Sequence, residues 1–138
     1  MTGSIASTGS RVTKIWAADG EFTNMPTVGG TSLSSTFATI NANVNAQTGT
    51  TYTLQASDNG KVVTLSNAGA ITVTVPSGLG AGFNVLLVQI GAGQVTVSPS
   101  STTINNRQSQ TKIAGQYGVA NLVCYTANVC AFGGDTSN

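Results

Sequence analysis

Short runs of alternating apolar and polar residues follow one another between residues 52 and 97. Within each run, β-branched and other apolar residues occupy every second position, which is the periodicity of a strand with one buried face. The runs begin at Tyr52, Lys61, Ile71, Phe83 and Gln94. This pattern predicts an all-β fold.

Glycine-containing turns separate these runs, at residues 58–60, 67–69, 76–78 and 91–93. Each turn combines Gly with Asn, Pro or another Gly, a composition typical of tight reversals between antiparallel strands. We therefore expect successive strands to pair with each other as hairpins.

Two further strands are predicted near the carboxyl end, at residues 116–126 and 129–133. Seven or eight short strands at roughly regular intervals favour two stacked antiparallel sheets, as in a β-sandwich or jelly roll. We expect one domain over residues 1–138, with an extended amino-terminal arm and first strands in residues 1–50 and the sandwich core in residues 51–136.

The amino-terminal segment has a different composition. Residues 1–10 are small and polar and suit an arm, whereas residues 11–25 contain the only Trp and four of the charged residues. Residues 11–16 could be a first strand with Trp16 over the core. They could also anchor on a neighbouring protein, because Trp and Arg dominate interface hot spots. The candidate partner contacts are Arg11, Lys14, Trp16, Phe22 and Met25.

Residues 33–44 carry an ambiguous pattern. Leu33, Phe37, Ile40 and Val44 have the spacing of one apolar helix face. The Ser, Thr and Asn residues between them lower helix propensity, and the segment around Phe37 would also suit a strand. Helix and strand both stay open.

The two cysteines are predicted to face each other. A turn at residues 126–128 places Cys124 opposite Cys130 on neighbouring strands. The geometry permits a disulfide, but closing so short a loop adds little stability in the chain-entropy account. We favour buried free thiols over a bridge. Two Cys without any His make a metal site improbable.

The residues needed for enzyme chemistry are scarce. The chain has no His, which removes the usual catalytic base and the Ser-His-Asp and Cys-His arrangements. Of the four carboxylates, only Asp19 and Glu21 are neighbours, and a solvated turn is the commoner reason for such a pair. The glycines of residues 78–82 join strand to strand, so they lack the helix that a phosphate loop requires. We expect a non-enzymatic protein without a cofactor.

Charge is unusually sparse, and this limits the partners. Charged residues make up 7 % of the chain, and residues 62–106 contain none. The five cations are scattered, whereas phosphate binding needs clustered Lys and Arg. No apolar run is long enough to cross a bilayer. Nucleic acid and membrane are therefore not expected partners, and a net charge of +1 favours association with other protein surfaces.

Several stretches resemble a β-rich module of tailed-bacteriophage structural proteins. They are residues 52–67, residues 71–76, residues 88–97 and the terminal Phe132-Gly-Gly-Asp135. Such modules occur in capsid decoration proteins, also called cement proteins, and in tail fibres and spikes. A small chain of this kind most resembles a jelly-roll cement protein.

The resemblance implies a virion protein on the outer capsid surface, made in the cytoplasm of the bacterial host. Its expected partners are the major capsid protein, bound across capsomers, and a second copy of itself. A homodimer is the first expectation and a trimer the second. The alternative is a tail-fibre or receptor-binding β-module.

Overall fold

The computed structural model of the protein describes residues 27–28, 31–32 and 43–138. The chain divides into two units, residues 1–39 and residues 40–138. In the first unit, β1 (Thr27–Val28) and β2 (Thr31–Ser32) pair antiparallel. The predicted arm, all five candidate partner contacts and most of the ambiguous 33–44 segment lie outside the described residues. Only Asn43 and Val44 of that segment are described, and Val44 begins a strand.

The regular structure of the second unit is all strand apart from one short 3-10 helix, which confirms the all-β class. Its elements are β3 (Val44–Gln47), β4 (Thr51–Thr53), η1 (Ala56–Asp58), β5 (Val62–Leu65), β6 (Ile71–Pro76), β7 (Asn84–Gln89), β8 (Val95–Ser100), β9 (Thr103–Asn105), β10 (Lys112–Ile113), β11 (Val119–Thr126), β12 (Val129–Gly134) and β13 (Thr136–Ser137). The first strand begins at Val44, before the expected core boundary at residue 51.

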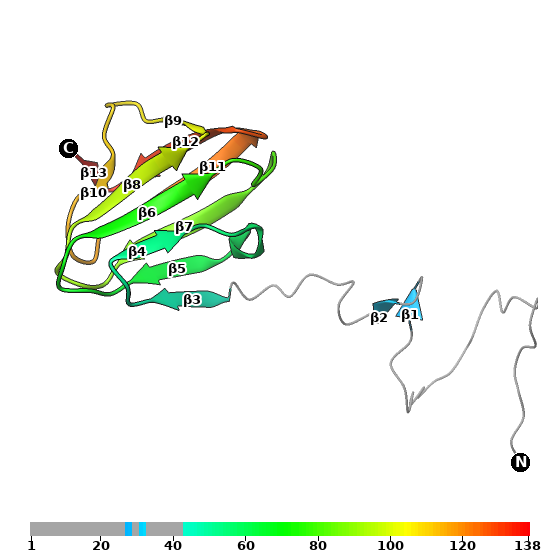
Figure 1. Ribbon diagram of the computed structural model, residues 1–138, viewed down its shortest axis with the longest axis horizontal. Helices are drawn as coiled ribbons and strands as arrows, with labels where there is room; N and C mark the ends of the chain where they lie inside the picture. The colour runs from blue at the N-terminus through cyan, green and yellow to red at the C-terminus, as the bar shows by residue number, and fades with distance from the viewer. Residues whose placement is uncertain (1–26, 29–30, 33–42) are drawn as a thin grey trace, which may run out of the picture. The chain divides into compact units, whose positions relative to one another are not determined.

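These strands form two sheets that lie face to face (Figure 1). One has six strands in the order β3-β5-β7-β11-β12-β9, and the other has five in the order β13-β10-β8-β6-β4. We call them the six-stranded and the five-stranded sheet. Consecutive strands from β3 to β8 alternate between the two sheets, so the chain winds in three flattened coils: β3-β4, β5-β6 and β7-β8.

The winding corrects the predicted pairing. β3, β5 and β7 pair parallel in one sheet, and β4, β6 and β8 pair parallel in the other. The expected hairpins between successive strands are therefore wrong for this part of the chain, and an antiparallel jelly roll is replaced by a short β-solenoid. The glycine turns are real, but they are corners that carry the chain from one sheet to the other.

The stacking of successive corners explains the parallel winding. A Cβ atom added to Gly93 would lie 1.8 Å from the carbonyl oxygen of Gly69, and one added to Gly91 would lie 2.3 Å from the backbone of Asn67. The Gly93 N–H donates to the Asn67 carbonyl at 2.8 Å. The Asn67 side chain donates in turn to the Thr48 carbonyl of the first coil. Each corner thus rests on the backbone of the one before it.

The coils repeat along the sequence as well as in space. Val62 pairs with Leu86 and Ile71 pairs with Val95, in both cases 24 residues later. The first coil is shorter, since Val44 pairs with Val62 only 18 residues later. In a parallel stack each residue lies beside its equivalent in the next coil, so a sequence repeat appears as a row of like side chains.

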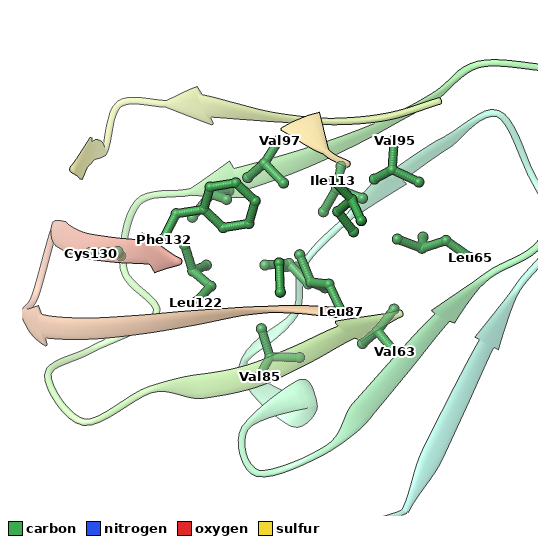
Figure 2. Packing of buried hydrophobic residues seen from close by; sticks show 14 of the residues in the cluster. Val63, Leu65, Val85, Leu87, Val95, Val97, Ile113, Leu122, Cys130 and Phe132 are labelled. Carbon is green, nitrogen blue, oxygen red and sulfur yellow. The ribbon is translucent and has the colours of Figure 1, made fainter. Parts of the chain in front are cut away.

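The hydrophobic core fills the space between the two sheets. Alternate residues of each strand point inward, which is why the predicted alternation correctly identifies the buried positions. Figure 2 shows Val63, Leu65 and Leu87 on one side, with Val95 and Val97 facing them. Ile113, Leu122 and Phe132 extend the same cluster into the carboxyl-terminal strands.

The carboxyl-terminal strands close one end of the coils with antiparallel pairing. β11 pairs antiparallel with β7, and β12 folds back on β11 as the one predicted hairpin that the structure contains in residues 43–138. On the other sheet, β10 pairs antiparallel with β8 and with β13. This reversal ends the parallel series after the third coil.

Corner stacking leads to a direct test by glycine substitution. Gly93→Ala places a methyl group inside the Gly69 backbone, so it should lower the free energy of unfolding by about 3 kcal/mol or more, as overpacking of a tight site does. Gly115→Ala is the matched control, because the added methyl group meets no atom within 4 Å and the glycine has no positive φ. Urea unfolding of both variants measures the difference, and equal stabilities would contradict the stacked corners.

Candidate functional sites

A hydrogen-bonded polar cluster occupies the interior of the first coil. Asp58, at the end of η1, is 1 % exposed. Its carboxylate accepts hydrogen bonds from the Tyr52 hydroxyl at 2.6 Å, from the Asn45 side chain at 2.8 Å and from the Gln55 backbone N–H at 2.8 Å. The Gln47 side chain donates to Asn45. We call Asn45, Gln47, Tyr52 and Asp58 the polar layer.

The polar layer takes the place of apolar core residues in the next coil. Asn45 pairs with Val63, Gln47 with Leu65 and Tyr52 with Val73, and these three partners are fully buried. In the first coil, amide, phenol and carboxylate groups therefore occupy the inward positions that apolar side chains occupy in the second coil. A polar terminal layer is what a solenoid needs where its stack of apolar coils ends.

The electrostatics of Asp58 and Tyr52 follow from this contact. Burial raises the pKa of the Asp58 carboxyl, but the hydrogen bonds from Tyr52, Gln55 and Asn45 and the nearby charge of Lys61 outweigh it and leave that pKa below its ordinary value. Burial first, and then the bond to Asp58 and its negative charge, raise the pKa of Tyr52 to about 12. Asp58 is therefore an ionised and fully bonded acceptor, which suits a structural role better than proton transfer.

The outward positions of the two sheets differ in chemistry. On the five-stranded sheet, Thr51 pairs with Thr72, Thr72 with Thr96 and Thr53 with Thr74, so that side is lined by hydroxyls. On the six-stranded sheet, the outward positions of β3, β7 and β11 include five exposed large apolar residues: Val44, Leu86, Val119, Val123 and Tyr125. We call this second surface the apolar face.

The apolar face carries no charge, and three of its apolar residues form a row across neighbouring strands. Val44 lies beside Val62 on β5, which lies beside Leu86 on β7, and Leu86 lies opposite Asn121 on β11. The outward residues of β3, β5, β7 and β11 include no Asp, Glu, Lys or Arg. Large exposed apolar patches on a protein surface are typical of sites that bind another molecule.

One cavity opens beside the carboxyl-terminal strands, with a volume of about 260 Å³. Its walls come from β8, β9, β12 and the loop between β9 and β10. The lining residues are Val97, Pro99, Ile104, Asn105, Asn106, Ser109, Gln110, Thr111 and Phe132. No local sequence pattern predicts this cavity, because its residues are brought together only by the return of the chain after the third coil.

The predicted register of the two cysteines is confirmed, but the preference for free thiols is wrong. Cys124 lies opposite Cys130 on the β11–β12 hairpin, and their sulfur atoms form a disulfide. Next to the turn, Thr126 pairs with Val129, and the register shifts between Thr126 and Cys124. The loop-entropy argument concerns how much a bond stabilises the fold, and it does not decide whether two facing thiols form one.

The carboxylate pair considered for catalysis, Asp19 and Glu21, lies outside the described residues. Residues 78–82 form the loop between β6 and β7, where Gly78, Gly80 and Gly82 all have positive φ. This loop joins two strands, as expected, although the strands belong to different sheets.

Residues 27–28, 31–32 and 43–138 contain neither a metal-binding cluster nor a membrane-spanning helix. No group of three or more His, Cys, Asp or Glu side chains there is arranged to hold a metal ion. In the same part of the chain, no helix has the length and apolar composition needed to cross a membrane.

Comparison with known proteins gives no relative. No protein family, no curated protein and no solved structure matches this chain.

The polar layer predicts a specific pH dependence. Asp58→Asn keeps the shape of the side chain but loses acceptor capacity toward three donors, so it should lower the free energy of unfolding by about 3 kcal/mol at pH 7. Because the folded-state pKa of Asp58 is lowered, its contribution is present above the unfolded-state pKa of about 3.9 and is lost as the pH falls below it. The difference between wild type and variant should therefore shrink in acid.

Chemical unfolding measures this difference in stability from pH 7 down to about pH 3. This pH range includes the ordinary pKa of an Asp carboxyl, about 3.9. Asp135→Asn is the control, since that residue is exposed and the substitution removes the same charge. A stability difference for Asp58→Asn that stays constant over the whole range would show that the ionised carboxylate is not what stabilises the first coil.

Proposed function

We propose that this protein is a structural protein that docks on a larger assembly, and specifically that it decorates and stabilises a bacteriophage capsid. The observation that carries the docking role is the apolar face of the six-stranded sheet. The sequence resemblance to phage structural modules is what directs the proposal to the capsid. In this proposal the protein lies on the outer surface of the virion and has no enzymatic activity.

The composition of the apolar face suits attachment to another protein. Burying Leu86, Val119 and Val123 releases water from apolar surface without removing the hydration of any charged group. The Tyr125 hydroxyl is held by the Asn105 side chain at 2.8 Å, so the ring is pre-positioned at the edge of this surface. A rigid aromatic residue with few rotamers loses little conformational entropy on binding.

Stabilisation would follow from mass action. A subunit that binds neighbouring capsomers of the assembled shell, and not free coat protein, adds its binding free energy to the shell at every copy. We propose the major capsid protein as the partner and a two-fold dimer as the bound form, with a trimer as the alternative. Arg11, Lys14, Trp16, Phe22 and Met25 remain candidates for a second contact.

A tail-fibre or receptor-binding module is the alternative function, and one feature of the fold favours it. β3 and β4 are the edge strands of their sheets, and among the described strands neither has a partner on its outer side. Parallel coils with open edges can be lengthened by further coils, which is the way a rod is built.

The stoichiometry of the virion separates the two functions. We expect purified particles that carry this protein to contain it in numbers comparable to the coat protein, because decoration covers the whole shell. Quantitative mass spectrometry of the particles gives the ratio. A few copies per particle would support the fibre module and contradict decoration.

The apolar face can be tested by adding charge to it. The double variant Leu86→Lys/Val123→Lys should fold with little change in melting temperature, because both side chains are partly exposed, but its affinity for the shell should fall at least tenfold, or about 1.4 kcal/mol. Thr72→Lys/Thr96→Lys adds the same charge to the outward side of the five-stranded sheet and should bind normally. Co-sedimentation with undecorated particles measures the binding of both variants. Full binding by the Leu86/Val123 variant would show that the apolar face is not the surface that contacts the shell.

A further inference from the structure

The cavity beside β9 combines an apolar floor with a polar rim. Pro99 and Ile104 supply the accessible part of the floor, while Val97 and Phe132, which also line the cavity, are almost completely buried. The rim is formed by Asn105 and by residues of the loop that follows it. An apolar lining with a few placed polar groups is the usual composition of a small-molecule site.

The loop that forms the rim is held in one conformation. The Asn106 side chain accepts hydrogen bonds from the backbone N–H groups of Gln108 and Gln110, and it donates to the Phe132 carbonyl and the Thr136 hydroxyl. Ser109 takes a left-handed conformation, with φ of 58°, at the bend that these bonds create. Asn106 is therefore a positioning residue, and the rim is formed before any ligand arrives.

Gln110 offers the rim a hydrogen-bond donor. Its Oε1 accepts from the Thr136 hydroxyl at 2.6 Å, which fixes the orientation of the amide. No hydrogen bond among the described residues occupies its Nε2 group, and Ser109 and Thr111 are among the other lining residues. Donors and acceptors are thus available above an apolar surface.

The chemistry of the lining selects a class of ligand. None of the lining residues is charged, and the exposed Arg107 of the same loop is not among them. An ionic ligand would lose its hydration without gaining a counter-charge. The volume of about 260 Å³ is slightly below the range of about 300–1,000 Å³ for drug-sized ligands, so the site suits one small ring.

We propose that this cavity binds a single neutral sugar ring, with an N-acetylated hexose as the best fit. The acetyl methyl group and one face of the ring would contact Pro99 and Ile104. The acetamide and the ring hydroxyls would pair with Gln110, Ser109 and Thr111. The ring could be a free monosaccharide or the end of a glycan chain, since both present the same groups. This activity does not depend on the docking role of the apolar face.

The test is an NMR titration of the full-length protein with N-acetylglucosamine and with its methyl glycoside, which stands for a ring at the end of a chain. We expect chemical-shift changes at the amides of Asn105, Asn106 and Gln110, with a dissociation constant on the order of 1 mM, typical of weak binding. Glucose should bind at least threefold more weakly because it lacks the acetyl group. Glucuronic acid should bind at least tenfold more weakly because of its charge.

A pair of glutamine substitutions supplies the matched control. Gln110→Glu keeps the acceptor for Thr136 but removes the Nε2 donor and adds a charge at the rim, so affinity should fall at least tenfold. Gln108→Glu adds the same charge to an exposed residue of the same loop that does not line the cavity, and affinity should stay within twofold.

Three results would overturn the proposal: no shift changes in the wild type at tens of millimolar sugar, changes confined to residues away from the cavity, or equal affinity of the two glutamine variants. Sugar binding by the Leu86→Lys/Val123→Lys variant should be normal, so failure of the docking role and failure of the sugar site are distinguishable. The wild-type titration by itself decides the proposal if Gln110→Glu does not fold.

Discussion

The spacing between coils at their corners is the constraint on which the fold depends. Parallel strands in neighbouring coils must lie about 4.8 Å apart to share hydrogen bonds, and the chain must also turn from one sheet to the other at that spacing. At the third coil, only residues without a Cβ atom can pass so close to the preceding corner, as Gly91 and Gly93 do over Asn67 and Gly69. With the corners in register, every inward residue lies above its equivalent, and the apolar rows of the core follow.

The apolar core ends in different ways at the first and at the third coil. At the first coil, inward apolar positions are replaced by Asn45, Gln47 and Tyr52, whose polar groups bond to each other and to Asp58. At the third coil, the chain reverses direction, and the β11–β12 hairpin covers the edge of β7. Within the described residues, the core therefore ends in polar groups at the first coil, where β3 and β4 are edge strands, and beside a hairpin at the third.

Much of this fold could be predicted from local pattern. The alternation located β5 to β8, β11 and β12. In β11, the alternate positions Ala120, Leu122 and Cys124 are the buried ones. Strand direction could not be read in the same way, because a glycine corner between two sheets has the same composition as a hairpin turn. The missing signal was the match between residues 62–76 and residues 86–100, a repeat that indicates coils rather than hairpins. The sites were less predictable. The polar layer could have been located only through that repeat, and the cavity depends on contacts between β8, β9 and β12 that no local pattern contains.

The 24-residue repeat also determines how the length of this protein can change without loss of the fold. Inserting or removing one residue inside a strand would turn every later side chain of that strand to the opposite side and place its apolar residues in water. A whole coil, by contrast, brings its own inward residues, its own corner and its own place in both sheets. The spacing from β3 to β5 is six residues shorter than the spacing from β5 to β7, and β4 is three residues long where β6 has six. A coil can therefore be shortened at its corner and at the end of a strand without loss of the pairing register. Variation in length among proteins of this design should come in complete coils or in changes at the corners and strand ends.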